Sequence, residues 1–280
     1  MIDTHVHIWD PERVHYAWLE GEGPILNRTY NIQQWVEATE GNGITGALLI
    51  QAANNPEDTA LMLEAADSCS LVKGVVGWLP LLEPEKVSRL LGGNFGSNKY
   101  IKGIRHLIHN EPDPRWLLLP EVVESLKMVA AHGLTYDLVG IIPEHIKTVL
   151  LLAEKVPDLL MVFDHLNQPP IDTGEKFGEW GELMAEAALH QKFYCKISGL
   201  GFPSGKPFKW TGEDVAPYIE FVLQKFGSDR CFCGGDWPVS LLAGDYSFTM
   251  DIYLSVLQGL LDKGDLDKVL SRNAEAFYKL

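Results

Sequence analysis

The sequence predicts an α/β protein built as a single (β/α)8 TIM barrel. Runs rich in Val, Ile, Leu and aromatic residues recur eight times, and a loop and a helical pattern follow each run. The 280 residues also match the usual size of such a barrel, which is about 250 residues. A doubly wound sheet is the competing architecture, but Asp10, Pro11 and Glu12 stand where its glycine-rich phosphate loop would follow the first strand.

The eight apolar runs are expected to be parallel strands. Most of them show little polar alternation, as strands that are buried on both faces do. Their expected ranges are Ile2–Trp9, Ile44–Gln51, Lys73–Pro80, Ile101–His109, Leu134–Gly140, Leu160–Leu166, Lys192–Gly199 and Arg230–Asp236.

The segments between these runs carry helix signals. Asn55 is placed to cap a helix that begins at Pro56, and a second helix is expected to begin at Pro120 and to end before Gly133. No linker or change of composition divides the chain, so residues 1–280 are expected to form one domain. Its C-terminal part, about 247–280, is expected to close the barrel with helices over Ser247–Leu261 and Leu266–Lys279.

Charge and composition limit the function. The formal net charge of −15 would repel nucleic acid and anionic membranes. The sequence shows no signal-peptide pattern and no apolar run long enough to span a bilayer. Its four cysteines lack the spacing of a zinc ribbon or a redox motif. We expect a cytoplasmic enzyme that acts on a small molecule, and a homo-oligomer is compatible with these properties.

Two histidines stand in the first expected strand. Side chains two residues apart on a strand share a face, so His5 and His7 are expected to meet one environment. Buried imidazoles need partners, because each ring carries groups that donate or accept hydrogen bonds. Active sites of TIM barrels lie at the C-terminal ends of the strands. Polar residues also fall there in this chain: Arg105, His106, Tyr136, Asp137, Asp164, His165, Lys196, Ser198 and Asp236.

Three imidazoles and a carboxylate from these strand ends form a donor set for one divalent metal ion. His5, His7, His165 and Asp236 would offer three nitrogens and one oxygen, which suits zinc with a position open for water. Asp236 would accept a proton as water attacks a carbonyl group. The glycines just before Asp236 leave room in front of its carboxylate. No organic cofactor is expected.

Five segments carry a resemblance to a known family: IDTHVHIWDPERVHYAWL, IKGIRHLIHNEPDPRWLLLPEVVESLKMVAAHGLTYDLV, DHLNQPPI, KISGL and CGGDWPV. In order and spacing they resemble the amidohydrolase superfamily, in the branch that includes L-rhamnono- and L-fucono-lactonases and 2-pyrone-4,6-dicarboxylate lactonase. The resemblance implies hydrolysis of a cyclic ester with Asp236 as general base. It also implies that His5, His7 and His165 hold either a metal ion or the substrate carbonyl.

The chain departs from the binuclear members of this superfamily. Those members carry a lysine or glutamate on strand four and a histidine on strand five, where this chain has Arg105 with His106 and Tyr136 with Asp137. A two-metal centre is therefore not expected. The lactonase branch includes metal-independent members, and in that version Arg105 would be the catalytic oxyanion donor. One metal ion and direct polarisation by histidine and arginine both stay open.

Five further residues are candidates for contact with the substrate. His106, Tyr136 and Lys196 are polar groups at strand ends, and Trp237 follows the expected general base. Trp18 lies in an aromatic, glycine-containing loop after the first strand and would cover a sugar-like ring. For each of them the alternative is a structural role in the barrel wall. His165 is expected to take part in catalysis beside Asp236.

Taken together, these residues predict a hydrolase that opens a small lactone, namely a sugar-acid lactone such as those of rhamnose or fucose. A neutral polyhydroxy substrate fits the scarcity of basic residues at the strand ends. A metal-dependent decarboxylase or an amide hydrolase on the same barrel is the first alternative. A catalytically silent protein that binds a sugar acid is the second.

Overall fold

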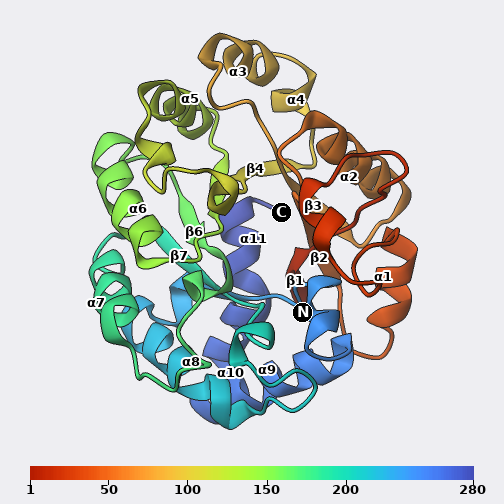
Figure 1. Ribbon diagram of the computed structural model, residues 1–280, viewed down its shortest axis with the longest axis vertical. Coiled ribbons are helices and arrows are strands. Elements are labelled where there is room, and N and C mark those ends of the chain that lie inside the picture. Colours follow the sequence, from red (N-terminus) through yellow and green to blue (C-terminus); the bar gives the residue numbers. More distant parts are fainter.

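Eight parallel strands form one sheet in the computed structural model, which describes residues 1–280 (Figure 1). Each strand pairs in parallel with the next along the chain. All eight expected strands are present, and all are shorter than expected because residues at their ends belong to loops. Their bounds are Ile2–Val6 (β1), Gly46–Ile50 (β2), Val72–Gly77 (β3), Ile101–His106 (β4), Thr135–Leu138 (β5), Met161–Phe163 (β6), Phe193–Ile197 (β7) and Cys231–Cys233 (β8).

The last strand returns to the first and nearly closes the sheet into a barrel. A parallel bridge joins Val6 to Trp237. On either side of it the His7 amide donates to the Trp237 carbonyl at 2.7 Å and the Asp236 amide donates to the His5 carbonyl at 2.8 Å. This closure with alternating helices confirms the predicted (β/α)8 barrel.

Helices surround the strands in Figure 1. Local signals set where they begin: the Asn55 side chain accepts from the Asp58 amide, with Pro56 in the first turn, and prolines also begin α3, α5 and α6. The bounds are Ile32–Ala38 (α1), Pro56–Ser68 (α2), Pro84–Leu91 (α3), Asn94–Ser97 (α4), Pro120–Ala131 (α5), Pro143–Lys155 (α6), Gly178–Ala187 (α7), Gly212–Phe226 (α8), Tyr246–Leu260 (α9), Lys263–Asp267 (α10) and Asn273–Tyr278 (α11).

The C-terminal region differs from the single helix expected over Leu266–Lys279. A π-helical turn over Lys268–Arg272 separates α10 from α11. Just after this turn, the Asn273 side chain donates to the carbonyls of Ser228 at 2.6 Å and Cys231 at 2.9 Å. An extra residue in a helical turn changes which side chains face inward, and this change accompanies the anchoring of Asn273 at the start of β8.

Helix α11 covers the N-terminal end of the barrel and lies across the middle of the ring in Figure 1. Phe277 and Tyr278 belong to an apolar cluster with Ile2, Val162 and Phe232 from the barrel strands. The larger apolar core contains residues of the strands, the loops and the surrounding helices. Burial at this end therefore comes from aliphatic and aromatic side chains.

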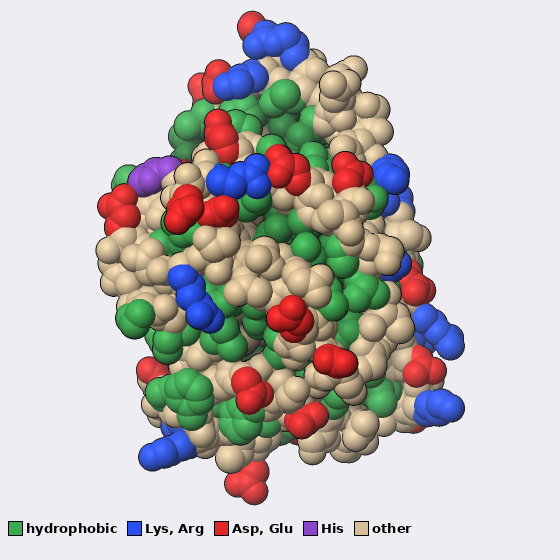
Figure 2. Space-filling model, turned by 90° about the vertical axis from the view of Figure 1, so that its right-hand side faces the viewer, with side chains coloured by type: hydrophobic (Ala, Val, Ile, Leu, Met, Phe, Trp, Pro, Cys, Tyr) green, Lys and Arg blue, Asp and Glu red, His purple; other side chains and the backbone are tan.

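The surface carries both signs of charge. On the face drawn in Figure 2, acidic and basic side chains are interspersed and do not gather into one basic patch. No helix has the length and hydropathy needed to cross a bilayer. The polar groups that remain to be placed lie inside the barrel, at its C-terminal end.

Candidate active site

Strands β1 and β8 bring the first two histidines and Asp236 together. His5 lies in β1, His7 follows the end of that strand, and Asp236 follows β8; all three are at least 95% buried. A Cβ atom at Gly234 would stand 2.8 Å from both the Cβ and the backbone nitrogen of His5. Glycine at this position is therefore what allows the two strand ends to run so close together.

His165 reaches the same place from a strained loop after β6. The residues from His165 to Gln168 all have φ between 50° and 55°, in the left-handed region. Asp236 also has a positive φ, of 54°. The left-handed region costs a residue other than glycine about 1–2 kcal/mol, and strain of this kind is concentrated at functional sites. Gly199 leaves space for the His165 ring, which a Cβ there would overlap.

The four side chains predicted as metal ligands lie around Asp236, and the ligand atoms of three of them, His5, His165 and Asp236, are all within 4.8 Å of one another. The Oδ1 atom of Asp236 lies 3.8 Å from Nε2 of His5, 3.6 Å from Nε2 of His7 and 3.8 Å from Nε2 of His165. This oxygen is buried and has no hydrogen-bond partner. Tetrahedral zinc with bonds of about 2.0–2.2 Å separates its ligand atoms by about 3.4 Å. The spacing around Asp236 therefore fits one small divalent ion.

Hydrogen bonding prepares the histidines as ligands. His7 Nδ1 lies 2.7 Å from the Ile50 carbonyl, which can only accept, so the proton is on Nδ1 and Nε2 carries a lone pair. His5 Nε2 is 3.1 Å from His7 Nε2, so these two ring nitrogens face the same space. A partner on the second ring nitrogen is what orients histidine ligands in metal sites.

Burial keeps these imidazoles neutral. It lowers the pKa of His7 to about 3, that of His5 well below its usual value, and that of His165 in the same direction. Burial raises the pKa of Asp236, with the nearby His165 opposing this shift. Neutral imidazole is the form that binds metal ions, and a carboxylate with a raised pKa is a stronger base.

Arg105 and Lys196, both predicted at strand ends, are held in a buried ionic network. Arg105 Nη1 donates to Asp164 Oδ2 at 3.0 Å, and its remaining donors bond to Gln51. Lys196 donates to Asp137 and lies 3.0 Å from Asp164 Oδ1. Two cations thus face two carboxylates. Burial opposes the ionisation of Asp164, yet Lys196 and the other neighbouring cations hold its pKa well below the usual value.

This network touches the donor set through His5. Asp164 Oδ1 and Lys196 Nζ each lie 3.4 Å from His5 Nδ1, and Arg105 Nη1 lies 3.4 Å from His5 Nε2. Arg105 pairs with Asp164 and not with Asp137, its neighbour on β5. Whether Arg105 also acts on a substrate oxygen stays a prediction.

His106 lies in a separate aromatic pocket. Its ring stacks on Trp116 with centroids 4.1 Å apart, and Trp78 Nε1 donates to its Nδ1 at 3.1 Å. The proton of the neutral ring must then be on Nε2, which donates to Glu111 at 2.7 Å. Both ring nitrogens of His106 therefore have hydrogen-bond partners within the protein. Its contact with the substrate stays a prediction.

The remaining predicted contacts are distributed around the barrel. Tyr136 is fully buried, with a hydroxyl that has no partner. Trp237 is 2% exposed and packs edge-on against Tyr30. Trp18 is only partly buried, and its Nε1 donates to the Ala52 carbonyl at 2.8 Å. Among these three side chains Trp18 is the most accessible to a ligand.

Several residues on which the site depends could not be selected from the sequence. Asp164 and Asp137 were noted at strand ends without a role, and Gln51, Ser198 and Asp3 had none either. Asp3 is fully buried, and its carboxylate accepts from the amides of His5 and Gly235 at 3.0 and 2.8 Å. The sequence did contain a signal for Asp3, because it is an acid inside an apolar strand run. A fully buried acid is almost always paired, so partners near Asp3 could have been expected.

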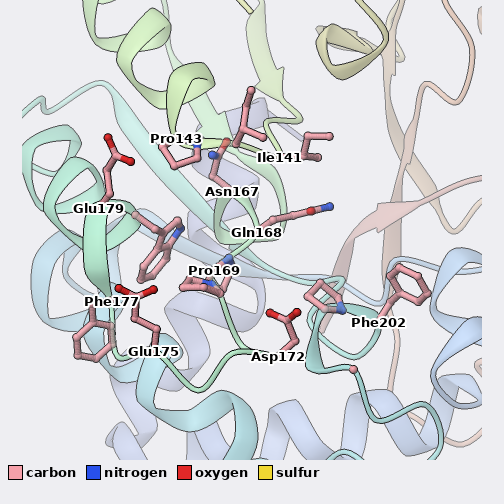
Figure 3. Close-up of a pocket in the computed structure, with 15 residues that line it drawn as sticks. Ile141, Pro143, Asn167, Gln168, Pro169, Asp172, Glu175, Phe177, Glu179 and Phe202 are labelled. Carbon is pink, nitrogen blue, oxygen red and sulfur yellow. The ribbon is translucent and has the colours of Figure 1, made fainter.

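A cavity of about 720 Å³ opens at the same end of the barrel (Figure 3). Three segments form it: residues 141–143 after β5, residues 167–180 after β6, and residues 202–205 after β7. Phe202 also lines a small void of about 10 Å³ that reaches Asp236. Phe202 is thus shared by the cavity and by the void that reaches Asp236.

Similarity to known proteins agrees with this arrangement. The amidohydrolase family model matches residues 2–280, which is almost the whole chain. The chain belongs to the amidohydrolase family. This confirms the resemblance that the motifs carry.

Individual proteins are similar to this chain over most or all of its length. An L-fucono-1,5-lactonase from Burkholderia ambifaria is 28% identical, with 100% of this chain and 95% of that protein aligned. An L-rhamnono-gamma-lactonase from Scheffersomyces stipitis is 26% identical over 71% of this chain and 65% of its own. The crystal structure of an amidohydrolase from Burkholderia multivorans with bound zinc superposes with a TM-score of 0.90 at 22% identity, covering 100% and 99% of the two chains.

Proposed function

We propose that this amidohydrolase opens the ester of a small sugar-acid lactone by attack of water, with Asp236 as general base. The observation that carries the proposal is the unpartnered Oδ1 of Asp236, which lies within 3.8 Å of three imidazole nitrogens. A buried carboxylate oxygen with no donor is free to take a proton from water. Similarity to one lactonase over the whole chain and to another over 71% of it supports a lactone as the substrate.

The donor set supports one divalent ion as the cofactor, with zinc favoured by three nitrogens and one oxygen. His5, His7, His165 and Asp236 would hold it. Such an ion supplies Lewis-acid polarisation of the lactone carbonyl. The balance of buried charges also supports a bound cation. Arg105 and Lys196 are matched by Asp137 and Asp164, so Asp236 is left as an anion without a cation paired to it.

The protein groups have separate tasks in this reaction. Asp236 takes the proton of the attacking water. The Nδ1 atom of His165 lies 3.0 Å from Ser198 Oγ, so that Nε2 faces Asp236. This nitrogen would bind the ion, or in the metal-independent version it would orient the attacking water. His5 keeps its position through Asp164 and Lys196. Burial of all these groups strengthens their electrostatic effect on the carbonyl.

The test is acid release from a panel of aldonolactones, measured with a pH indicator and corrected for spontaneous hydrolysis. Asp236→Asn keeps the shape of the side chain, and we expect it to lower kcat by about 10²–10⁴. Glu182→Gln, an exposed change on α7, is the matched control and should leave the rate unchanged. Folded, zinc-loaded protein that releases acid from no lactone would contradict the proposal.

The same preparation decides between the open alternatives. Metal analysis should find one zinc per chain, and chelation should abolish acid release and lower the Tm. Full activity after complete chelation would favour direct polarisation by the histidines and Arg105. Release of CO₂ from a carboxylated substrate, with no lactone opened, would assign the barrel to a decarboxylase.

A further inference from the structure

The cavity of about 720 Å³ has no task in the reaction as proposed so far. It lies between the loops that follow β5, β6 and β7, and therefore at the end of the barrel that carries the donor set. Its lining combines aromatic rings and prolines with amides and carboxylates; the residues used below are Asn167, Gln168, Asp172, Glu175, Glu179 and Phe202.

A single stretch of backbone connects the donor set to this cavity. In the left-handed run after β6, His165 faces Asp236, while Asn167 and Gln168 line the cavity. Two peptide units separate the Cα atoms of His165 and Asn167 by at most about 7.6 Å. In Figure 3 Gln168 extends into the space between Ile141 and Phe202. A ligand of sugar size that reacts at Asp236 and extends along this backbone run would reach the cavity.

Asn167 is the polar group that most needs a ligand there. Its side chain is only 1% exposed, yet neither Nδ2 nor Oδ1 has a hydrogen-bond partner. A buried polar group without a partner costs about 1–3 kcal/mol. The amide offers a donor and an acceptor together, and a hydroxyl group can satisfy both. A carboxylate could use only the Nδ2 side.

The charge around the cavity excludes anions. Three of its lining residues are acidic and none is Lys or Arg. Glu179 is neutralised by Lys147 at 2.6 Å, whereas Asp172 and Glu175 form no ion pair. These two exposed carboxylates face any ligand that enters and would repel a second carboxylate on it.

We propose that this cavity is the subsite for the hydroxyl-bearing, uncharged part of the lactone, and that Asn167 is a specificity-determining residue in it. The subsite selects neutral polyhydroxylated lactones over unsubstituted lactones by hydrogen bonding, and over anionic lactones by repulsion. The inference rests on the proposed lactonase activity and adds the class of substrate that the site accepts.

The test compares kcat/KM of the full-length, zinc-loaded enzyme on three lactones of equal ring size. They are δ-valerolactone, a neutral aldono-1,5-lactone and a 1,5-lactone with a free carboxylate. In Asn167→Leu, which has nearly the same volume but no amide, the preference for the aldonolactone over δ-valerolactone should fall at least tenfold. Gln168→Ala, at an exposed position, should lower the same ratio about threefold.

The charge argument has its own variant. Replacing Asp172 by Asn and Glu175 by Gln together should raise the relative kcat/KM on the anionic lactone about three- to tenfold. Glu182→Gln, on the same helix as Glu179 but outside the cavity lining, should leave all three ratios unchanged. The zinc content of each variant shows whether the donor set is intact.

The outcomes separate the two proposals. If wild-type enzyme opens none of the three lactones, the lactonase proposal fails. If it opens all three with equal efficiency, or if the Asn167 and Gln168 variants lose activity on every lactone by the same factor, the lactonase stands and the subsite is overturned. Equal ratios in the charge variant and wild type would likewise overturn the selection against anions.

Discussion

The two ends of the barrel are built on opposite principles. At the N-terminal end Phe277 and Tyr278 of α11 pack on the strands, and the tilted Phe277 ring has its centroid 4.6 Å from that of Tyr194 and 5.1 Å from that of Phe232. At the C-terminal end the buried residues are histidines and acids, several backbone positions are left-handed, and some buried polar atoms have no partner. Both ends exclude water, with opposite consequences.

At the apolar end, burial stabilises the fold in proportion to the area removed from water. At the polar end, the same exclusion shifts pKa values and leaves groups such as Asp236 Oδ1 ready to interact. The comparison teaches that this protein keeps stability and reactivity at separate ends of one barrel. Four variants test that division.

The largest effect is expected at Asp164, which faces Arg105 and Lys196 under the donor set. Asp164→Asn leaves two buried cations with one carboxylate, so the free energy of unfolding should fall by about 3–5 kcal/mol. Zinc affinity should fall about 10–100-fold, because His5 loses its carboxylate partner. Urea titration and a competitive zinc indicator measure the two quantities. Asp158→Asn is the exposed control, and a loss below about 1 kcal/mol would contradict the role of the network.

The next variant removes packing at the opposite end. Phe277 is 3% exposed, and Phe277→Ala should lower the free energy of unfolding by about 3 kcal/mol. Because Phe277 touches no residue of the donor set, kcat per folded molecule should stay at the wild-type value. A large fall in kcat at full folding would show that the two ends are not separate.

A third variant tests, through its pH dependence, whether burial at the C-terminal end shifts pKa values. Asp58 holds the loop after β2, accepting from the Ala52 amide at 2.9 Å and the Tyr16 hydroxyl at 3.0 Å. Burial raises the pKa of Asp58 to about 6, above its usual 3.8. The folded state therefore binds a proton that the unfolded chain releases, and this stabilisation is full below pH 4 and lost as the pH rises through 6.

In Asp58→Asn this titration is absent. The free energy of unfolding of wild type relative to the variant should decrease by about 2–3 kcal/mol between pH 4 and pH 7. Urea unfolding of both proteins at several pH values measures the difference. A difference that does not change with pH would show that Asp58 has an ordinary pKa.

The smallest effect is expected where the two ends meet. The Tyr278 hydroxyl of α11 donates to Asp137 at 2.8 Å, and Asp137 in turn accepts from Lys196. Tyr278→Phe removes this bond to a charged group and should lower the free energy of unfolding by about 1.5 kcal/mol. Thermal unfolding measures the loss, and a variant as stable as wild type would indicate that Lys196 alone satisfies Asp137.

The fold could be predicted from the sequence because strand and helix patterns are local and repeat eight times. The positions of His5, His7, His165 and Asp236 could be predicted because each follows from a place at a strand end. The pairing of side chains could not. Tyr278 and Asp137 lie 141 residues apart in the chain, and no local pattern announces such a contact.

Side-chain direction was the second limit. Arg105 and Lys196 stand at strand ends as predicted, but their charged groups are turned into the network around Asp164. The left-handed run from His165 to Gln168 contains no glycine, which is the usual sign of that conformation. The cavity that depends on this run was therefore also beyond prediction.

The seam between β1 and β8 has a consequence for how the protein matures. His5 and His7 precede Asp236 by more than 220 residues in the chain, so they are synthesised well before it, and the complete donor set forms only after β1 and β8 have met. An incomplete chain lacking β8 can bind zinc only through a partial set of ligands. Tight metal binding would thus act as a check on assembly, present only in molecules whose barrel has closed.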